Sequence, residues 1–239
     1  MPDLPDGAGA AAAVTGGRTP GTLTHTLWIS AADVFAKIID HPYIQGLVNG
    51  TLDRGCFAQF LQEDRHYIRA FARSLNLLAV KSPRPKWSRM FTAHAGDAIA
   101  AEEAVQVQLL QALGSAVGQE TGSGSPTTFA YAAHLIANCY DGSFLEGLAT
   151  ILPCYWIYAE VGTVLQSVGS PDPVFASWIE SYAGQDYGAV VASVLEVVDE
   201  LGATAGTSEQ RRCVEVYRVG SRLEWMFWDA AYRRETWPV

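Results

Sequence analysis

The chain has 239 residues, of which 49% are hydrophobic and 17% charged, and its formal net charge is −9. This length and apolar content are sufficient for one globular domain with a sizeable core. The acidic balance argues against nucleic acid or an anionic membrane as the main partner, because both favour clusters of Lys and Arg. We therefore expect the partner to be a small molecule or another subunit.

The pattern of the N-terminal segment leads us to expect no targeting signal in it. It is rich in Gly and Ala and lacks the basic start and apolar run of a signal peptide. No later segment is long, apolar and uncharged enough to suggest a membrane span. We interpret residues 1–24 as a flexible tail and residues 25–239 as a single helical domain.

Helical periodicity dominates the rest of the chain. Ser30-Ala-Ala-Asp33 has the form of a capping box that opens a helix, and His41-Pro42 ends it. A turn-rich stretch follows as far as Gly55. An apolar stripe then predicts a long helix from Cys56 to Val80, and after a proline-rich break a third helix runs from about Trp87 to Leu113.

The second half of the chain continues the same pattern after a loop at 121–126. This loop is no phosphate cradle, because it lacks the Gly-Lys-Ser/Thr of a P-loop. Further helices are predicted at about 127–139, through a cysteine-bearing segment to about 168, and at 174–182, 186–201 and 208–234. Almost no segment shows the alternation of strands. The sequence predicts an all-α bundle of about seven or eight helices.

The chain has four cysteines, Cys56, Cys139, Cys154 and Cys213. They form no Cys-x-x-Cys pair and have no histidines at metal spacing, which is typical of reduced thiols and favours a cytoplasmic protein.

One of these cysteines lies in an apolar and aromatic run, Leu152-Pro-Cys-Tyr-Trp-Ile-Tyr158. At helical spacing Cys154 and Tyr158 share a face. If Pro153 is the first residue of the helix, the helix dipole favours the thiolate and Cys154 is a candidate nucleophile. If Pro153 lies inside the helix, it kinks the rod. The alternative interpretation of Cys154 is a small buried hydrophobe.

Two carboxylates interrupt otherwise apolar helix faces. Asp64 has apolar or aromatic neighbours one turn away on both sides, and Glu224 is the one charge on a face of the last helix. Carboxylates that face inward from different helices can divide the roles of acid and base. Asp64 could instead pair with Arg65 or Arg69, and Glu224 with Arg222, although helical geometry does not favour the second pair.

Aromatic side chains and one metal-like motif accompany these carboxylates. Four tyrosines could sandwich a flat heteroaromatic ring, although each one alone is more often ordinary packing: Tyr67, Tyr131, Tyr158 and Tyr182. Glu63-Asp-Arg-His66 has the Glu-x-x-His spacing of di-metal bundles. Such bundles need the motif twice, and no second copy exists. We therefore expect no metal.

Four segments together resemble the TenA/thiaminase II family, in the correct order: His41-Pro-Tyr-Ile-Gln-Gly46, Phe60-Leu-Gln-Glu-Asp64 with Tyr67, Leu152 to Tyr158, and Glu224-Trp-Met-Phe-Trp-Asp229. The match covers about residues 26–237, and the cysteine is similar to that of the cysteine-bearing branch. The resemblance implies a haem-oxygenase-like helical bundle, usually a homotetramer. It also implies hydrolysis of aminopyrimidines in thiamin salvage, with possible cleavage of thiamin and no cofactor.

Residue roles carried over by this resemblance are as follows. Cys154 looks like the nucleophile that adds to the pyrimidine, and Asp64 like the partner of its ring nitrogen and amino group. Glu224 looks like the acid that protonates the leaving amine and then activates water, with Tyr158 helping to set the geometry. The walls and rim of the pocket would be Tyr67, Tyr131, Tyr182 and Phe227. The implied reaction converts 4-amino-5-aminomethyl-2-methylpyrimidine and water to hydroxymethyl pyrimidine and ammonia.

One departure from the family pattern concerns the third helix. Where the family often has Glu-x-x-x-His, this chain has Glu102 followed by Gln106, which can hydrogen-bond but cannot titrate. Two rival functions stay open. One is a thiamin or pyrimidine carrier without catalysis, and the other is a haem oxygenase with His25 or His41 as the axial ligand.

Overall fold

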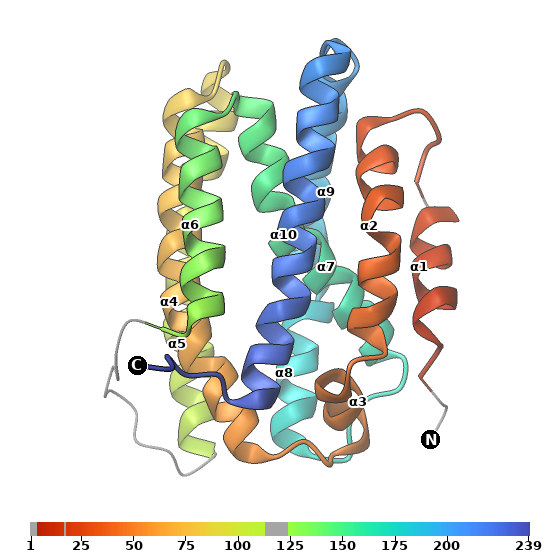
Figure 1. Ribbon diagram of the computed structural model, residues 1–239, viewed down its shortest axis with the longest axis vertical. Coiled ribbons are helices and arrows are strands. Elements are labelled where there is room, and N and C mark those ends of the chain that lie inside the picture. The colour runs from red at the N-terminus through yellow and green to blue at the C-terminus, as the bar shows by residue number, and fades with distance from the viewer. Residues whose placement is uncertain (1–3, 17, 113–123) are drawn as a thin grey trace.

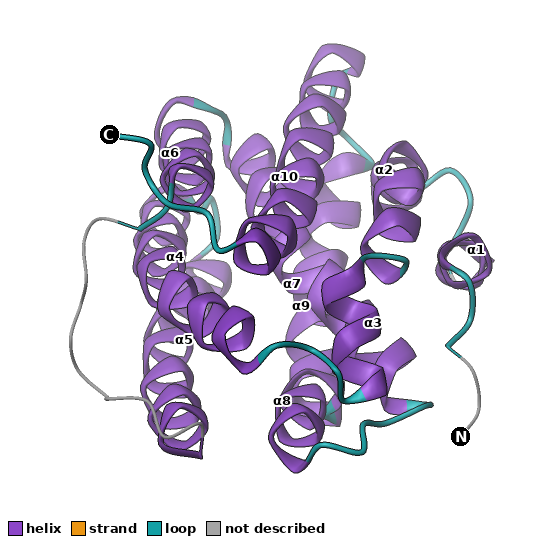
Figure 2. Cartoon of the chain, turned by 60° about the horizontal axis from the view of Figure 1, so that its bottom comes forward, coloured by secondary structure: helices purple, strands orange, loops and turns teal. Residues whose placement is uncertain are grey.

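The computed structural model describes residues 4–16, 18–112 and 124–239, without the side chains at 102, 103, 105–108, 110 and 111. In these residues the chain forms helices and loops and no strand (Figure 2), so the all-α prediction is confirmed. The helices are α1 (Gly7–Gly16), α2 (Leu23–Ile39), α3 (Pro42–Asn49), α4 (Arg54–Lys81), α5 (Pro85–Ala112), α6 (Pro126–Asp141), α7 (Phe144–Gln166), α8 (Pro173–Ala183), α9 (Gln185–Gly202) and α10 (Thr207–Arg233).

Long helices run side by side and enclose α7. Helices α4, α5 and α6 form one side of the bundle, and α2 and α1 form the other, with α10 between them (Figure 1). The short helices α3 and α8 cover the lower end in this view. Helix α7 packs against α2, α4, α6, α8, α9 and α10. Side chains on nearly every face of α7 are therefore in the core.

This central position explains why α7 is so apolar. By length and composition alone, α7 could cross a membrane, although no segment was predicted to do so. However, 78% of its most apolar window is buried inside the bundle. A helix that is apolar on all sides is typical of a protein core as well as of a membrane span.

Part of the segment predicted as a flexible tail is helical. Helix α1 lies along the outside of α2 (Figure 2) and buries Ala10 and Ala11. The indole of Trp28 donates to the carbonyl of Ala11 over 3.3 Å, and the Gly7 amide donates to Asp40 over 2.9 Å. Small residues let α1 approach closely, because a Cβ at Gly7 would collide with the α2 backbone.

The predicted boundaries are wrong at the start of the bundle. Helix α2 begins seven residues before Ser30, with Thr22 as its N-cap, and Ser30 lies inside the helix. The stretch after Asp40, predicted as turns, contains α3. His41 caps this helix by accepting the amide of Tyr43 over 3.0 Å, and Gly50 ends it with φ of 67°. Helix α2 does end before His41-Pro42, as predicted, but Pro42 is also the first residue of α3, a position that suits proline.

Candidate active site

A cavity of about 260 Å³ lies between α4, α5, α7, α8 and α9. Its volume is near the small end for ligand pockets, which suits a ligand of one or two rings. Its lining is mostly aromatic and apolar, with a few polar groups: Leu61, Asp64, Tyr67, Ile68, Phe71, His94, Asp97, Ala98, Ala101, Cys154, Tyr155, Tyr158, Trp178, Ser181, Tyr182, Tyr187 and Val190. The sequence-predicted residues Cys154, Asp64, Tyr67, Tyr158 and Tyr182 all reach this cavity.

Cys154 presents its thiol to the cavity from the middle of α7. Pro153 lies inside this helix, so the possibility that it starts the helix, with the dipole acting on Cys154, is wrong. Instead the pKa of the Cys154 thiol is raised well above its ordinary value, first by burial and then by the nearby carboxylate of Glu224. The thiol is therefore protonated at rest and must lose its proton during any reaction.

Glu224 supplies a second buried acid, from α10. It is 1% exposed, and the hydroxyl of Tyr131 donates to its Oε1 over 2.5 Å. Burial raises the pKa of Glu224 to about 8, although the Tyr131 hydrogen bond lowers it and Asp64 raises it further. Glu224 is therefore mostly protonated at neutral pH. Arg222, the alternative partner, is exposed to solvent.

Asp64 approaches the site from α4. Its side chain is half-buried and lines the cavity. Its charge raises the pKa of both Cys154 and Glu224, so the three groups are close enough to influence one another's protonation.

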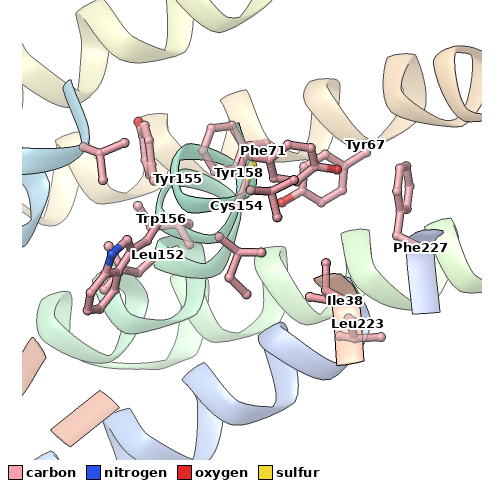
Figure 3. Close-up of a cluster of buried hydrophobic side chains, with 14 of the residues drawn as sticks. Ile38, Tyr67, Phe71, Leu152, Cys154, Tyr155, Trp156, Tyr158, Leu223 and Phe227 are labelled. Carbon is pink, nitrogen blue, oxygen red and sulfur yellow. The ribbon is translucent and has the colours of Figure 1, made fainter. Parts of the chain in front are cut away.

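Tyr67 lies between the thiol and the Glu224 side of the site. Its ring centroid is 4.7 Å from that of Tyr131 and 5.7 Å from that of Phe227. Its buried hydroxyl lies near the Cys154 thiol and lowers the thiol pKa, without the geometry of a full hydrogen bond. Figure 3 shows Tyr67 and Phe71 facing Cys154 across the cluster, while Trp156 lies on the other side of α7.

The predicted rim residues divide into two groups. Tyr158 and Tyr182 line the cavity, with ring centroids 5.0 Å apart. Tyr131, Glu224 and Phe227 are not part of the lining and lie behind it, each at most 3% exposed. Two of them surround Tyr67, whose ring contacts those of Tyr131 and Phe227.

Sequence reasoning missed seven polar or aromatic lining residues: Phe71, His94, Asp97, Tyr155, Trp178, Ser181 and Tyr187. No motif marks His94 or Asp97, but helical spacing could have found them. His94, Asp97, Ala98 and Ala101 recur at intervals of three and four residues on one face of α5.

The remaining metal and haem candidates have structural roles or lie away from the cavity. Glu63 accepts hydrogen bonds from the Ser125 amide (2.8 Å) and the Thr128 hydroxyl (2.5 Å), so it anchors the start of α6. His41 caps α3, and neither it nor His25 lines the cavity described here. The side chains of Glu102 and Gln106 on α5 lie outside the described part of the structure.

The chain is similar in sequence to proteins that are named for thiamine biosynthesis or for aminopyrimidine hydrolysis. The chain is 32% identical to the thiamine biosynthesis multifunctional protein ThiED of Corynebacterium efficiens over 90% of its own length, and it spans 29% of that larger protein. It is 29% identical to an aminopyrimidine aminohydrolase of Bacillus subtilis, with 87% of this chain and 89% of that protein aligned.

The fold is also similar to that of solved structures. A TenA homologue from P. horikoshii superposes with a TM-score of 0.82 and 26% identity, over 89% of this chain and 99% of that one. A domain with a heme oxygenase-like fold from Shewanella denitrificans superposes at 0.68 with 17% identity, over 90% and 94% of the two chains, which confirms the predicted fold class. The TENA/THI-4/PQQC family model matches residues 28–234, and the chain therefore belongs to this family.

Proposed function

We propose that this protein is an aminopyrimidine aminohydrolase of thiamin salvage. It converts 4-amino-5-aminomethyl-2-methylpyrimidine and water to hydroxymethyl pyrimidine and ammonia, and it can also cleave thiamin. One observation carries the proposal. A buried thiol lines an aromatic cavity, and it interacts electrostatically with Asp64 and with Glu224, whose pKa is about 8. The relatives named aminopyrimidine aminohydrolase support the same activity.

The proposed reaction begins with the thiol of Cys154. Its sulfur forms a bond to a ring carbon, and the proton that the thiol loses ends on the ring nitrogen held by Asp64. Protonation makes the ring a better electron acceptor and so favours the addition. Because the thiol pKa is raised by burial, we expect this proton transfer to accompany the bond formation.

Glu224 then serves as acid and base in turn. The C–N bond at the 5-methylene carbon breaks, and the departing nitrogen takes the proton of Glu224 and leaves as ammonia. Water adds to the methylene carbon and returns one proton to Glu224. The sulfur leaves, the ring regains its aromaticity, and the nitrogen proton returns to the thiolate, so atoms and charges balance. A carboxyl whose pKa lies near the working pH suits both roles.

Aromatic side chains give the cavity its selectivity for a flat ring. Three tyrosines line the cavity from different helices: Tyr67 from α4, Tyr158 from α7 and Tyr182 from α8. Their rings can stack on a pyrimidine while the hydroxyls donate from the edge. We propose that Tyr158, one turn after Cys154, sets the angle at which the ring meets the thiol.

The test is product analysis with wild type and Cys154→Ala on the aminomethyl pyrimidine and on thiamin. We expect wild type to release hydroxymethyl pyrimidine, and Cys154→Ala to bind the ligand without turnover. Cys56→Ala, which removes a thiol outside the cavity, is the matched control and should stay active. Normal turnover by Cys154→Ala would refute the assignment of Cys154 as the nucleophile. Tight thiamin binding without product in wild type would instead support a carrier.

We also propose that the protein works in the cytoplasm as a homotetramer. Its four cysteines are free and buried, which suits a reducing compartment. Several large apolar side chains are exposed and could lie in subunit contacts: Val80, Phe129, Tyr140 and Trp237. Light scattering that gave the mass of one chain would refute the tetramer, and fractionation that found the protein outside the cytoplasm would refute the location.

A further inference from the structure

The segment after α10, residues 234–239, crosses from the end of α10 to the start of α6 (Figure 1 and Figure 2). In this segment the carboxylate of Glu235 accepts the backbone amide of Thr127, in the first turn of α6, over 3.0 Å. We propose that Glu235 is a positioning residue, which holds α6 against α10 so that the Tyr131 hydroxyl meets Glu224. Its part in the reaction rests on the proposed function.

The path of this segment is fixed at both ends. Arg234 ends α10 in the left-handed region, with φ of 51°, a conformation that a residue other than glycine keeps only where its surroundings hold it. Its guanidinium pairs with Asp53. At the other end the indole of Trp237 donates to the carbonyl of Gly124, just before α6, over 2.7 Å, and its ring contacts Phe129. The segment is therefore held in place between the two helices.

The hydrogen bond between Tyr131 and Glu224 lies between two links of α6 to α10. Tyr131 comes one helical turn after the amide that Glu235 accepts. Three residues further along α6, the imidazole of His134 hydrogen-bonds to the carbonyl of Val216 on α10 over 3.2 Å. The bond that these links enclose is 2.5 Å long, and its strength falls as the donor and acceptor separate. Loss of one link frees that end of α6 to move and so weakens the bond.

After burial, the Tyr131 hydrogen bond is the largest influence on the pKa of Glu224, and the charge of Asp64 comes next. Helices α2, α3, α4, α6 and α7 pack against α10, and no described charged group of α2 or α3 is among those that shift this pKa. Burial raises the pKa of the thiol and phenols around Glu224, so these groups are neutral where it titrates. The titratable groups that interact with Glu224 from α4, α6, α7 and α10 are Asp64, Tyr67, Tyr131, Cys154, Tyr158 and Tyr217.

The experiment measures the pKa of Glu224 in the full chain without substrate. Infrared difference spectroscopy follows the carbonyl stretch of the protonated carboxyl as pH changes, and the absence of the band in Glu224→Gln assigns it. Glu235→Ala is compared with Glu209→Ala, which removes the carboxylate that accepts the Ser143 hydroxyl before α7 over 2.5 Å. Each change removes one link between an end of α10 and the start of another helix, but only Glu235→Ala concerns the helix that bears Tyr131.

We expect Glu235→Ala to raise the pKa of Glu224 by about half a unit, because the Tyr131 bond is weakened and its complete loss is worth about one to two units. Loss of the Glu235 charge alone has the opposite sign, since removing a negative charge lowers the pKa of an acid. In a Tyr131→Phe background Glu235→Ala should therefore cause no rise, and Glu209→Ala should leave the pKa unchanged. No rise in Glu235→Ala, or an equal rise in the Tyr131→Phe background or in Glu209→Ala, would overturn the inference.

Kinetics with the same variants separate this inference from the proposed function. If wild type turns over the aminomethyl pyrimidine, the alkaline limb of its kcat/KM profile should move upward in Glu235→Ala together with the pKa of Glu224. A limb that stays in place while this pKa rises would overturn the positioning role in the reaction. If wild type makes no product, the proposed function fails, and the infrared titration still decides whether Glu235 holds Tyr131 against Glu224.

Discussion

Replacing Tyr131 with phenylalanine tests whether Glu224 is the acid. The change removes the hydroxyl that donates to Glu224 Oε1 over 2.5 Å and keeps the ring that packs against Tyr67. This hydrogen bond stabilises the charged form of Glu224 and so lowers its pKa, while burial holds the pKa at about 8. Without the bond, the pKa of Glu224 must rise.

The size of this rise follows from the strength of the bond. A hydrogen bond to a charged group contributes about 1.5–3 kcal/mol, and one pKa unit corresponds to about 1.4 kcal/mol. Loss of the Tyr131 hydroxyl therefore raises the pKa of Glu224 by about one to two units. Because the reaction needs protonated Glu224, wild-type activity falls as pH rises through about 8, and the variant keeps its protonated acid to higher pH.

The assay is the pH profile of kcat/KM for the aminomethyl pyrimidine, which reports the pKa values of the free enzyme. We expect the alkaline limb of Tyr131→Phe to lie about one to two pH units above that of wild type. Tyr140→Phe is the control, because Tyr140 lies on the same helix with its side chain exposed. An alkaline limb that stays in place, or that moves to lower pH, would refute the role assigned to Glu224.

Two further predictions concern how the scaffold holds the site. Glu63→Gln weakens the two hydrogen bonds that hold the first turn of α6, and we expect calorimetry to show a loss of about 1–3 kcal/mol in the free energy of unfolding. Stabilisation of wild type by added Mn²⁺ or Fe²⁺ would instead favour the di-metal interpretation. Gly162→Ala places a Cβ 2.8–3.0 Å from backbone at Tyr182, so α8 must move away from α7. We expect a cost of about 1–3 kcal/mol and weaker binding of hydroxymethyl pyrimidine, whereas Gly188→Ala, which faces open space, should change neither.

Predictions from the sequence were most accurate where local periodicity is strong. The helices from Cys56 onward, apart from the start of α7, begin and end within a few residues of their predicted positions, because most have an apolar face of helical period. No start was predicted for α7, which is apolar on nearly every face and begins at Phe144, nine residues before Pro153. Prediction failed at α1 and α3. Helix α1 is rich in Gly and Ala with no apolar stripe, and α3 begins at Pro42, which was interpreted only as the end of the helix before it. Contacts with α2 and the His41 cap decide these two helices.

Candidate residues were found from the sequence because each breaks a local pattern. Asp64 and Glu224 are charges on apolar faces, and Cys154 is a thiol in an aromatic run. Asp97 escaped notice because a charge on a surface helix breaks no pattern. Its place in the cavity lining depends on the packing of α5 against α4 and α8, which bear several of the other lining residues.

Helical periodicity was sufficient to predict an all-α chain, and breaks in that periodicity marked Cys154, Asp64 and Glu224 as unusual. The protonation of Cys154 and of Glu224 depends instead on how the helices pack. Tyr131 and Glu224 are 93 residues apart in the chain and 2.5 Å apart in space, and the burial that raises the pKa of Cys154 comes from helices on several sides of α7. Desolvation and charge depend on distance in space and not on spacing along the chain, so no local pattern could have predicted them.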